Sequence, residues 1–238
     1  MKKVSVLILG FFITAASFAQ TADEVLQNYF DVIGQHKVSS IQTMTATGKS
    51  QAMGMELPFK QVFKRPDKIM LEVDIQGSKM LQVYNGKTGW MTAPWTGSTE
   101  PIDITGPQLE AMKVQADLDG QLYNWKEKGY EMDFKGKEDF EGAQVYKIML
   151  TDTLKNSYMF LIDAETYILI KSSTTMTIQG NEITSDTFFS NYKEVEGMLL
   201  PHSVENKVNG QTQMVAIMEK YVFNETIDDS VFEKPVAR

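Results

Sequence analysis

The stretch Glu56–Gln76, ELPFKQVFKRPDKIMLEVDIQ, decides the fold because its side chains alternate in polarity on both sides of Pro66. Odd-numbered positions are mostly apolar, whereas the even-numbered positions carry most of the charges. Successive side chains of a strand point to opposite faces of a sheet. The stretch therefore predicts two β-strands that share one apolar face, formed by Leu57, Phe59, Phe63, Ile69, Leu71 and Val73.

The same two-residue period extends along most of the chain. Turn signals of the Asn-Gly and Glu-Gly kind separate the alternating segments, and such pairs are typical of tight hairpins. About a dozen strands joined by short turns predict a mainly β chain built as an antiparallel meander, hence a barrel or a strongly curved sheet. The expected strands are 38–50, 55–65, 68–76, 79–85, 88–92, 130–138, 143–151, 157–163, 166–178, 182–193, 198–208 and 212–223. The turn signals include Met53-Gly54, Asn85-Gly86, Gln179-Gly180, Glu196-Gly197 and Asn209-Gly210.

A helix is expected before the first strand. Thr21 and Glu24 have the spacing of a capping box, and apolar residues follow at helical spacing as far as Gly34. Glycine commonly ends a helix in the left-handed conformation. The pattern predicts one amphipathic helix whose apolar stripe lies against the sheet.

A central insertion, residues 94–129, interrupts the alternation. Its apolar spacing predicts a helix that begins near Thr105 and a further helical turn over 122–125. Long excursions from a meander are often functional. The insertion is therefore either a lid or a helix that caps one end of the sheet for stability, and the sequence leaves both interpretations open.

The first 19 residues predict export. Lys2 and Lys3 precede an apolar run, and Ser17-Phe18-Ala19 resembles the small-residue pattern before a signal-peptidase cut. The run is shorter than the about 20 residues that span a bilayer. We expect a signal peptide over 1–19, cleaved after Ala19, and a single soluble domain over 20–238 that acts outside the cytoplasm.

Composition excludes several functions. The chain contains no cysteine, so it forms no disulfide, and Gln20 stands where a bacterial lipoprotein would carry its acylated cysteine. The formal net charge is −8, and loss of Lys2 and Lys3 makes the chain more acidic still. Nucleic-acid binding requires a basic surface. We therefore expect neither self-lipidation nor a nucleic-acid partner.

Arg65 stands out because it falls on the apolar side of its strand. Its guanidinium has five donors, and helix ends or loop carbonyls are suitable acceptors. Such bonds would hold a lid and still break when a ligand displaces it. The alternative is an arginine that extends to solvent at the strand end.

The spacing of Lys64-Arg65-Pro66, Asn85–Trp90 (NGKTGW) and Pro94 resembles that of the LolA family of periplasmic lipoprotein carriers. The closing segment Phe223–Phe232 and the order of elements are also similar. The resemblance implies an incomplete antiparallel barrel with a helical lid over an apolar cavity. It also implies an acylated lipoprotein as cargo, an inner-membrane ABC transporter as donor and an outer-membrane receptor as acceptor.

In that family the arginine of the KRP motif bonds the lid backbone and governs its opening, and Arg65 matches it. The sequence departs from the family at Asn85, where Asp is usual, and at Gly89, which replaces a large apolar residue. Unbranched methionines adapt to variable shapes, so Met112 and Met149 join the six apolar residues above as expected cavity lining. Trp90 is the ninth expected lining residue, as a rim aromatic that contacts lipid, and the alternative is that it packs the end of the barrel.

Catalysis is not expected. His36 and His202 are the two histidines of the chain, and neither has a metal-ligand spacing or a nucleophile pairing. We predict no catalytic residue, no metal and no cofactor, and a monomer. Three functions remain open: a lipoprotein carrier, a carrier of another lipid, and a lipid-sensing regulatory module with the same pocket.

Overall fold

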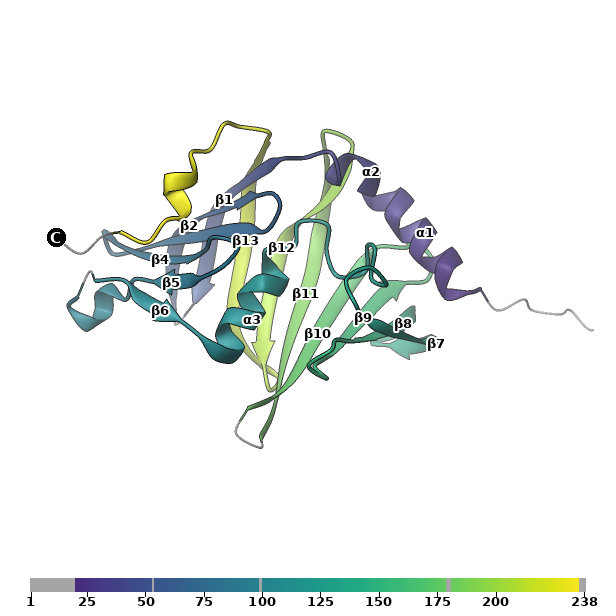
Figure 1. Cartoon of the computed structure of the whole chain (residues 1–238). Coiled ribbons are helices and arrows are strands. Elements are labelled where there is room, and N and C mark those ends of the chain that lie inside the picture. The colour runs from purple at the N-terminus through teal and green to yellow at the C-terminus, as the bar shows by residue number, and fades with distance from the viewer. Residues whose placement is uncertain (1–19, 53, 99, 179–180, 236–238) are drawn as a thin grey trace, which may run out of the picture.

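The computed structural model describes residues 20–52, 54–98, 100–178 and 181–235, which form a curved antiparallel sheet with short helices (Figure 1). The predicted signal peptide, residues 1–19, lies outside the described residues, as do parts of the predicted turns at Met53-Gly54 and Gln179-Gly180. In the described part of the chain, no helix is long and apolar enough to cross a bilayer.

The helical elements are α1 (Ala22–Ile33), α2 (Gln35–Val38), η1 (Pro94–Thr96), α3 (Gly106–Gln115) and η2 (Asp229–Phe232). The strands are β1 (Thr43–Ala52), β2 (Met55–Lys64), β3 (Lys68–Ile75), β4 (Ser78–Tyr84), β5 (Gly89–Met91), β6 (Ile102–Ile104), β7 (Glu131–Phe140), β8 (Ala143–Thr151), β9 (Ser157–Asp163), β10 (Leu169–Ile178), β11 (Asn181–Val195), β12 (Met198–Val208) and β13 (Gln211–Phe223).

The strands form a meander with one rearrangement. Sequence neighbours pair from β1 to β6 and from β7 to β13, and β13 also pairs with β1. The sheet therefore has 13 strands with β6 and β7 at its two edges, and it curls without closing into a barrel. This confirms the prediction of a mainly β chain with helices, built as an incomplete antiparallel barrel.

Three predicted boundaries differ from the structure. The segment expected to begin the first strand at residue 38 starts with the short helix α2, and β1 begins at Thr43. The insertion contributes the extra strand β6 as well as α3. Residues 122–125 form hydrogen-bonded turns instead of a helical turn, because the amides of Tyr123 and Lys128 bond to Gly120 and Asn124.

Helix α1 forms for the reasons that the sequence predicts. The Thr21 hydroxyl accepts from the Glu24 amide at 3.3 Å, and the Glu24 carboxylate accepts from the Thr21 amide at 2.9 Å. Gly34 ends the helix with a φ of 71°, a left-handed conformation that glycine adopts without steric cost. Val25 and Leu26 pack on β8 and β9 in an apolar cluster with Ile148 and Phe160.

The two faces of the sheet carry different covers. We call the side that packs against α1 and α3 the inner face, and the opposite side the outer face. Part of the outer face is covered by the C-terminal segment (Asn224–Pro235), which contains η2 and is yellow in Figure 1.

Candidate functional site

The candidate site is the inner face of β1 to β4. Phe59 pairs with Val73 and Phe63 pairs with Ile69, so the odd-numbered residues of β2 and β3 point to one side. Leu57, Phe59 and Val73 form a buried cluster with Ala216 of β13. Half-buried residues surround it, namely Ala52, Met55, Leu71, Ile75, Met80 and Met218. We call this the apolar area, and no residue of α1 or α3 belongs to it.

Helix α3 covers the neighbouring part of the same face. Met112 of α3 is buried against Ile69 and Tyr84, and so is Ala116, the residue that follows the last residue of α3. The helix lies close to β5 at Gly89, where a Cβ would lie 3.0 Å from Leu109 Cδ1 and 3.3 Å from Ile104 Cβ. A larger residue at position 89 would require Leu109 to shift.

The structure brings together seven of the nine predicted lining residues. Four lie in or beside the apolar area, and three lie under or on α3. The first group is Leu57, Phe59, Leu71 and Val73, and the second is Phe63, Ile69 and Met112.

Trp90 does not join this set. It pairs with Val83, which pairs in turn with Met70, and this row points to the outer face. The Trp90 indole Nε1 donates to the carbonyl of Phe232 at 3.2 Å, under the C-terminal segment. Of the two interpretations of Trp90, the structure supports packing at the end of the sheet.

Met149 also lies on the outer face. Its neighbours Ile148 and Leu150 are fully buried in the inner cluster below α1, and the alternation of β8 turns Met149 away from them. Met149 is half-buried and pairs with Met159 across the β8–β9 ladder. Neither Met149 nor Trp90 is therefore a candidate for the inner site.

Arg65 joins β2, α2 and the central insertion. Its Nη1 and Nη2 donate to the two carboxylate oxygens of Asp119 at 2.6 and 2.8 Å, a bidentate ion pair. Its Nε donates to the Ile41 carbonyl at 2.6 Å, and Nη2 also donates to the Val38 carbonyl at 3.2 Å. The guanidinium thus contacts the insertion through a side chain and the end of α2 through carbonyls.

Asp119 is the centre of a wider polar network. Its Oδ1 accepts from Ser39 Oγ at 3.0 Å and from Gln35 Nε2 at 3.3 Å. Burial by itself would raise the pKa of Asp119, but the hydrogen bonds from Arg65 and Ser39 outweigh it and lower the pKa below its ordinary value of 3.8. The same hydrogen bonds to Asp119 raise the pKa of Arg65. The pair is therefore fully ionised at neutral pH.

Sequence reasoning did not single out Asp119 or the other polar partners Gln35 and Ser39. Asp119 is 54 positions from Arg65, and nothing in the local pattern of the insertion marks it as different from the acidic residues around it. The sequence pointed to this site only through Arg65, because an arginine on an apolar strand face needs hydrogen-bond acceptors.

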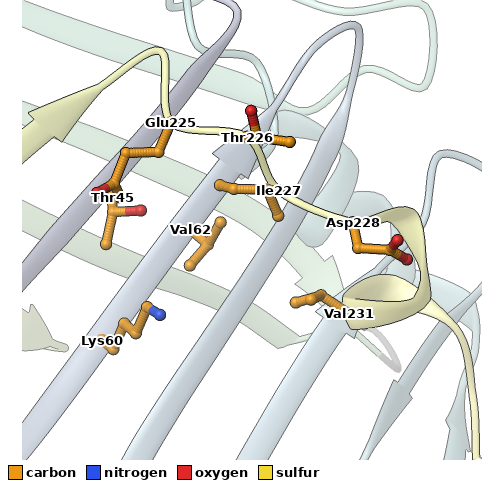
Figure 2. Close-up of a pocket in the computed structure, with 8 residues that line it drawn as sticks. All are labelled: Thr45, Lys60, Val62, Glu225, Thr226, Ile227, Asp228 and Val231. Carbon is orange, nitrogen blue, oxygen red and sulfur yellow. The ribbon is translucent and has the colours of Figure 1, made fainter.

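Two cavities are present away from the apolar area. One, of about 530 Å³, lies on the outer face between Thr45, Lys60 and Val62 and the C-terminal stretch 225–231 that crosses over them (Figure 2). The other, of about 430 Å³, lies between α1 and residues 122–127, beside Phe30 and Tyr123. The first has a lining of mixed polarity and lies under the C-terminal segment, on the face opposite α1 and α3.

The fold has clear relatives among solved structures. A DUF1329 family protein from Desulfovibrio piger superposes with a TM-score of 0.60 at 14% identity, over 88% of this chain and 97% of that one. A LolA superfamily protein from Nitrosomonas europaea gives 0.56 at 14% identity, over 91% and 99%. A putative outer membrane lipoprotein-sorting protein domain from Vibrio parahaemolyticus gives 0.57 at 13% identity, over 90% and 98%.

The sequence itself matches no family model and no curated protein. At identities this low the likeness establishes the fold alone. The chain has the LolA-type fold, an open antiparallel barrel with helices on its inner face, as the resemblance at Lys64–Pro66 and Asn85–Trp90 predicted.

Proposed function

We propose that this chain is a periplasmic carrier that shelters the acyl chains of lipoproteins on its inner face and moves them between membranes. The observation that carries the proposal is the apolar area around Leu57, Phe59 and Val73, to which neither α1 nor α3 contributes a residue and which adjoins a cover held by the Arg65–Asp119 pair. The LolA-type fold supports the same role, because one structural neighbour is described as a putative lipoprotein-sorting domain.

The energetics of acyl chains require such a surface. Each methylene kept from water is worth about 0.8 kcal/mol, so a free chain does not leave a membrane at a useful rate. Met55, Met80 and Met218 border the apolar area and are half-buried. Unbranched thioether side chains change rotamer at low cost, and this lets one surface fit chains of different shape.

The cover has to move for cargo to enter. Helix α3 holds the sheet through Met112 and Leu109, and the turns after it are held by the ion pair of Asp119 with Arg65. An incoming acyl chain would replace the apolar contacts of α3 with its own, while the ion pair would exchange its protein partners for water. Arg65 is thus the proposed lid latch, and Asp119 is its partner on the lid.

The sequence suggests a setting for this activity. The proposal takes the signal peptide predicted over 1–19 to be removed and the single domain predicted over 20–238 to act in the periplasm, as a monomer that is not itself lipidated. An inner-membrane ABC transporter and an outer-membrane acceptor are the partners that a carrier of this type needs. No catalytic group, metal or cofactor has a part in this proposal.

The test is lipid capture. The chain is purified without detergent from the compartment in which it is made, and bound molecules are identified by native mass spectrometry. We expect acylated lipoprotein or its acyl-bearing fragments to copurify, and a protein free of any acyl-bearing molecule would contradict the proposal.

A matched pair of variants locates the site. Phe59→Ser removes an inner-face residue, and Lys60→Ser changes the next residue, which lies on the outer face. We expect the first to lower the copurified lipid severalfold and the second to leave it unchanged, with circular dichroism showing that both remain folded. Equal loss in both variants would place the binding surface elsewhere.

A further inference from the structure

The inner face is not uniformly apolar. Hydroxyl and amide side chains gather on it where β10, β11 and β12 cross the middle of the sheet. Ser172 pairs with Thr187, Thr174 pairs with Ser185, and Thr187 pairs with Asn206, so all five point to the same side. We call these five residues the polar patch.

The register places the polar patch on the inner face. Ser172 and Thr174 also pair with Phe160 and Tyr158 of β9. Those two aromatic residues belong to the buried cluster that packs against Val25 of α1. The polar patch therefore lies on the same side of the sheet as the helices.

The polar patch adjoins the apolar area directly. Asn206 pairs with Met214 of β13, and in the next row Val204 pairs with Ala216. Ala216 is a member of the apolar cluster with Leu57 and Phe59. The apolar area and the polar patch therefore form one continuous surface, apolar at one end and hydrogen-bonding at the other.

The polar patch carries no charge, in contrast to the opposite side of the same strands. Lys171, Asp186 and Lys207 alternate with its residues and point outward, and Lys171 Nζ lies 3.1 Å from the Asp186 carboxylate. The strand pairings also show which residues share the inner face with the polar patch and the apolar area. Among the described residues of β9 to β13 and of β1 to β4 that are paired in this way, none is Lys, Arg, Asp or Glu.

The hydrogen-bonding groups of the polar patch are largely available. Asn206 Nδ2 donates to Ser185 Oγ at 3.0 Å, which leaves the Asn206 carbonyl oxygen and the Ser185 hydroxyl hydrogen for another partner. All five side chains are half-buried, so they face space that a ligand or water reaches. Water can satisfy these groups in the free protein, and a ligand that displaces this water has to supply hydrogen bonds of its own.

We infer that the ligand of the inner face joins its acyl chains to an uncharged headgroup rich in ester, amide or hydroxyl groups, which lies on the polar patch. This rests on the proposed function and narrows its cargo. A phosphate headgroup would be buried beside neutral hydroxyls with no cation to pair it, which is costly. The diacylglyceryl and N-acyl groups of a lipoprotein terminus and the sugar of a neutral glycolipid both have the required chemistry.

The test is a binding series on the full mature chain with three probes of equal acyl length. The probes are an N-acetylated diacylglyceryl lipopeptide with an uncharged peptide, a glycosyl diacylglycerol and a phosphatidylglycerol, so that each carries two long acyl chains. We expect the two neutral probes to bind at least about tenfold more tightly than the anionic one, because each displaced but unreplaced hydrogen bond or unpaired charge costs about a factor of ten. The tighter of the two neutral probes identifies the source of the headgroup.

Near-isosteric variants assign the effect to the polar patch. The triple variant Thr174→Val, Thr187→Val and Asn206→Leu should weaken both neutral probes about tenfold and leave the anionic probe unchanged. The control is Thr175→Val with Thr184→Val, since these two hydroxyls bond each other at 3.1 Å on the outer face.

Each outcome decides something. Phosphatidylglycerol binding as tightly as the neutral probes, or an unchanged preference in the triple variant, would overturn this inference and leave the carrier proposal standing. Failure of every probe to bind would overturn both. An equal effect of the outer-face control would also overturn the assignment to the polar patch.

Discussion

Strands β2 to β5 are covered on both faces, by α3 on the inner side and by the C-terminal segment on the outer side, and the two covers are held differently. Under the outer cover, Phe232 is completely buried among Val62, Met70 and Trp90. Under the inner cover, Met112 is buried against Ile69 and its surroundings. Both covers therefore bury apolar side chains on the same four strands.

The two covers differ in the polar contacts that hold them to the sheet. The outer one is bound to the sheet along its length, because Thr43 Oγ1 donates to the Glu225 carbonyl at 2.7 Å and Lys64 Nζ donates to the Ile227 carbonyl at 2.6 Å. Trp90 fixes its far end through the Phe232 carbonyl. The turns that follow α3 are held by the half-buried ion pair of Asp119, whose two members regain good solvation when the pair opens, and by Leu122, which is buried in the cluster below α1.

The comparison indicates that the outer cover is part of the fold, because its backbone carbonyls would lose their partners if it left the sheet. Under the proposed function the inner cover is the one that opens, and it would then exchange its charged pair for water and its apolar contacts for a ligand. Four changes test this difference, and they are taken from the largest expected effect to the smallest.

Phe232→Ala should destabilise the fold by about 3–5 kcal/mol, because it removes a fully buried aromatic ring and leaves a cavity on the outer face. Urea unfolding measures this loss. Val231→Ala is the control, since Val231 is 38% exposed and its loss should cost within about 0.5 kcal/mol. At temperatures where the variant is folded, lipid binding should be unchanged. A loss of binding in folded Phe232→Ala would show that the outer cover also has a part in uptake.

Arg65→Leu should cost about 1–3 kcal/mol, because it leaves the Asp119 carboxylate without its cation and removes the Arg65 donors from the Val38 and Ile41 carbonyls. The fold should remain intact, while bound acyl cargo should exchange faster with vesicles and the amides of residues 117–130 should exchange faster with deuterium. The double variant Arg65→Leu with Asp119→Leu should regain part of the stability, since neither partner is then left unpaired. Normal uptake and release by Arg65→Leu would remove Arg65 from the mechanism.

Much of this arrangement was predictable from local sequence. The alternation in β2 and β3 is regular over eight or more residues, so the inner positions from Leu57 to Val73 followed from the two-residue period. Helix α1 followed from its capping box and apolar stripe. These elements have patterns long enough to fix which side chains face the core.

The missed features depend on contacts between distant parts of the chain. Strand β5 has three residues, too few to show a period, and Trp90 is buried by Phe232, which lies 142 positions away. In β8, Val145, Ile148, Met149 and Leu150 are apolar on both faces, so the alternation could not assign Met149 to a side. The packing of α1 on Ile148 and Leu150 decided it.

Acid should loosen the inner cover before the outer one. The pKa of Asp119 is lowered in the folded chain by hydrogen bonds from Arg65 and Ser39, despite the opposing effect of burial. Its contribution to stability is therefore complete above its unfolded pKa, near 3.8, and is lost as the pH falls through the lower folded pKa.

The measurement is deuterium exchange of residues 117–130 and the free energy of unfolding between about pH 6 and about pH 2. Asp119→Asn has no carboxylate to protonate, so its curve should be flatter than that of the parent chain at the acidic end. Parallel curves for the two proteins would show that this ion pair does not link pH to the inner cover.

Asp229→Asn should have the smallest effect, although Asp229 of the outer cover contacts one lysine of β2 and one of β3. Its carboxylate lies 2.7 Å from Lys64 Nζ and 3.1 Å from Lys68 Nζ, and hydrogen bonds from these two lysines lower the pKa of Asp229. The side chain is 60% exposed, so water and salt screen both pairs, and exposed ion pairs add little to stability. We expect the urea midpoint in moderate salt to match that of the parent chain. A loss as large as that of Phe232→Ala would mean that charge, and not the burial of Phe232, holds the outer cover, and the contrast between the two covers would then fail.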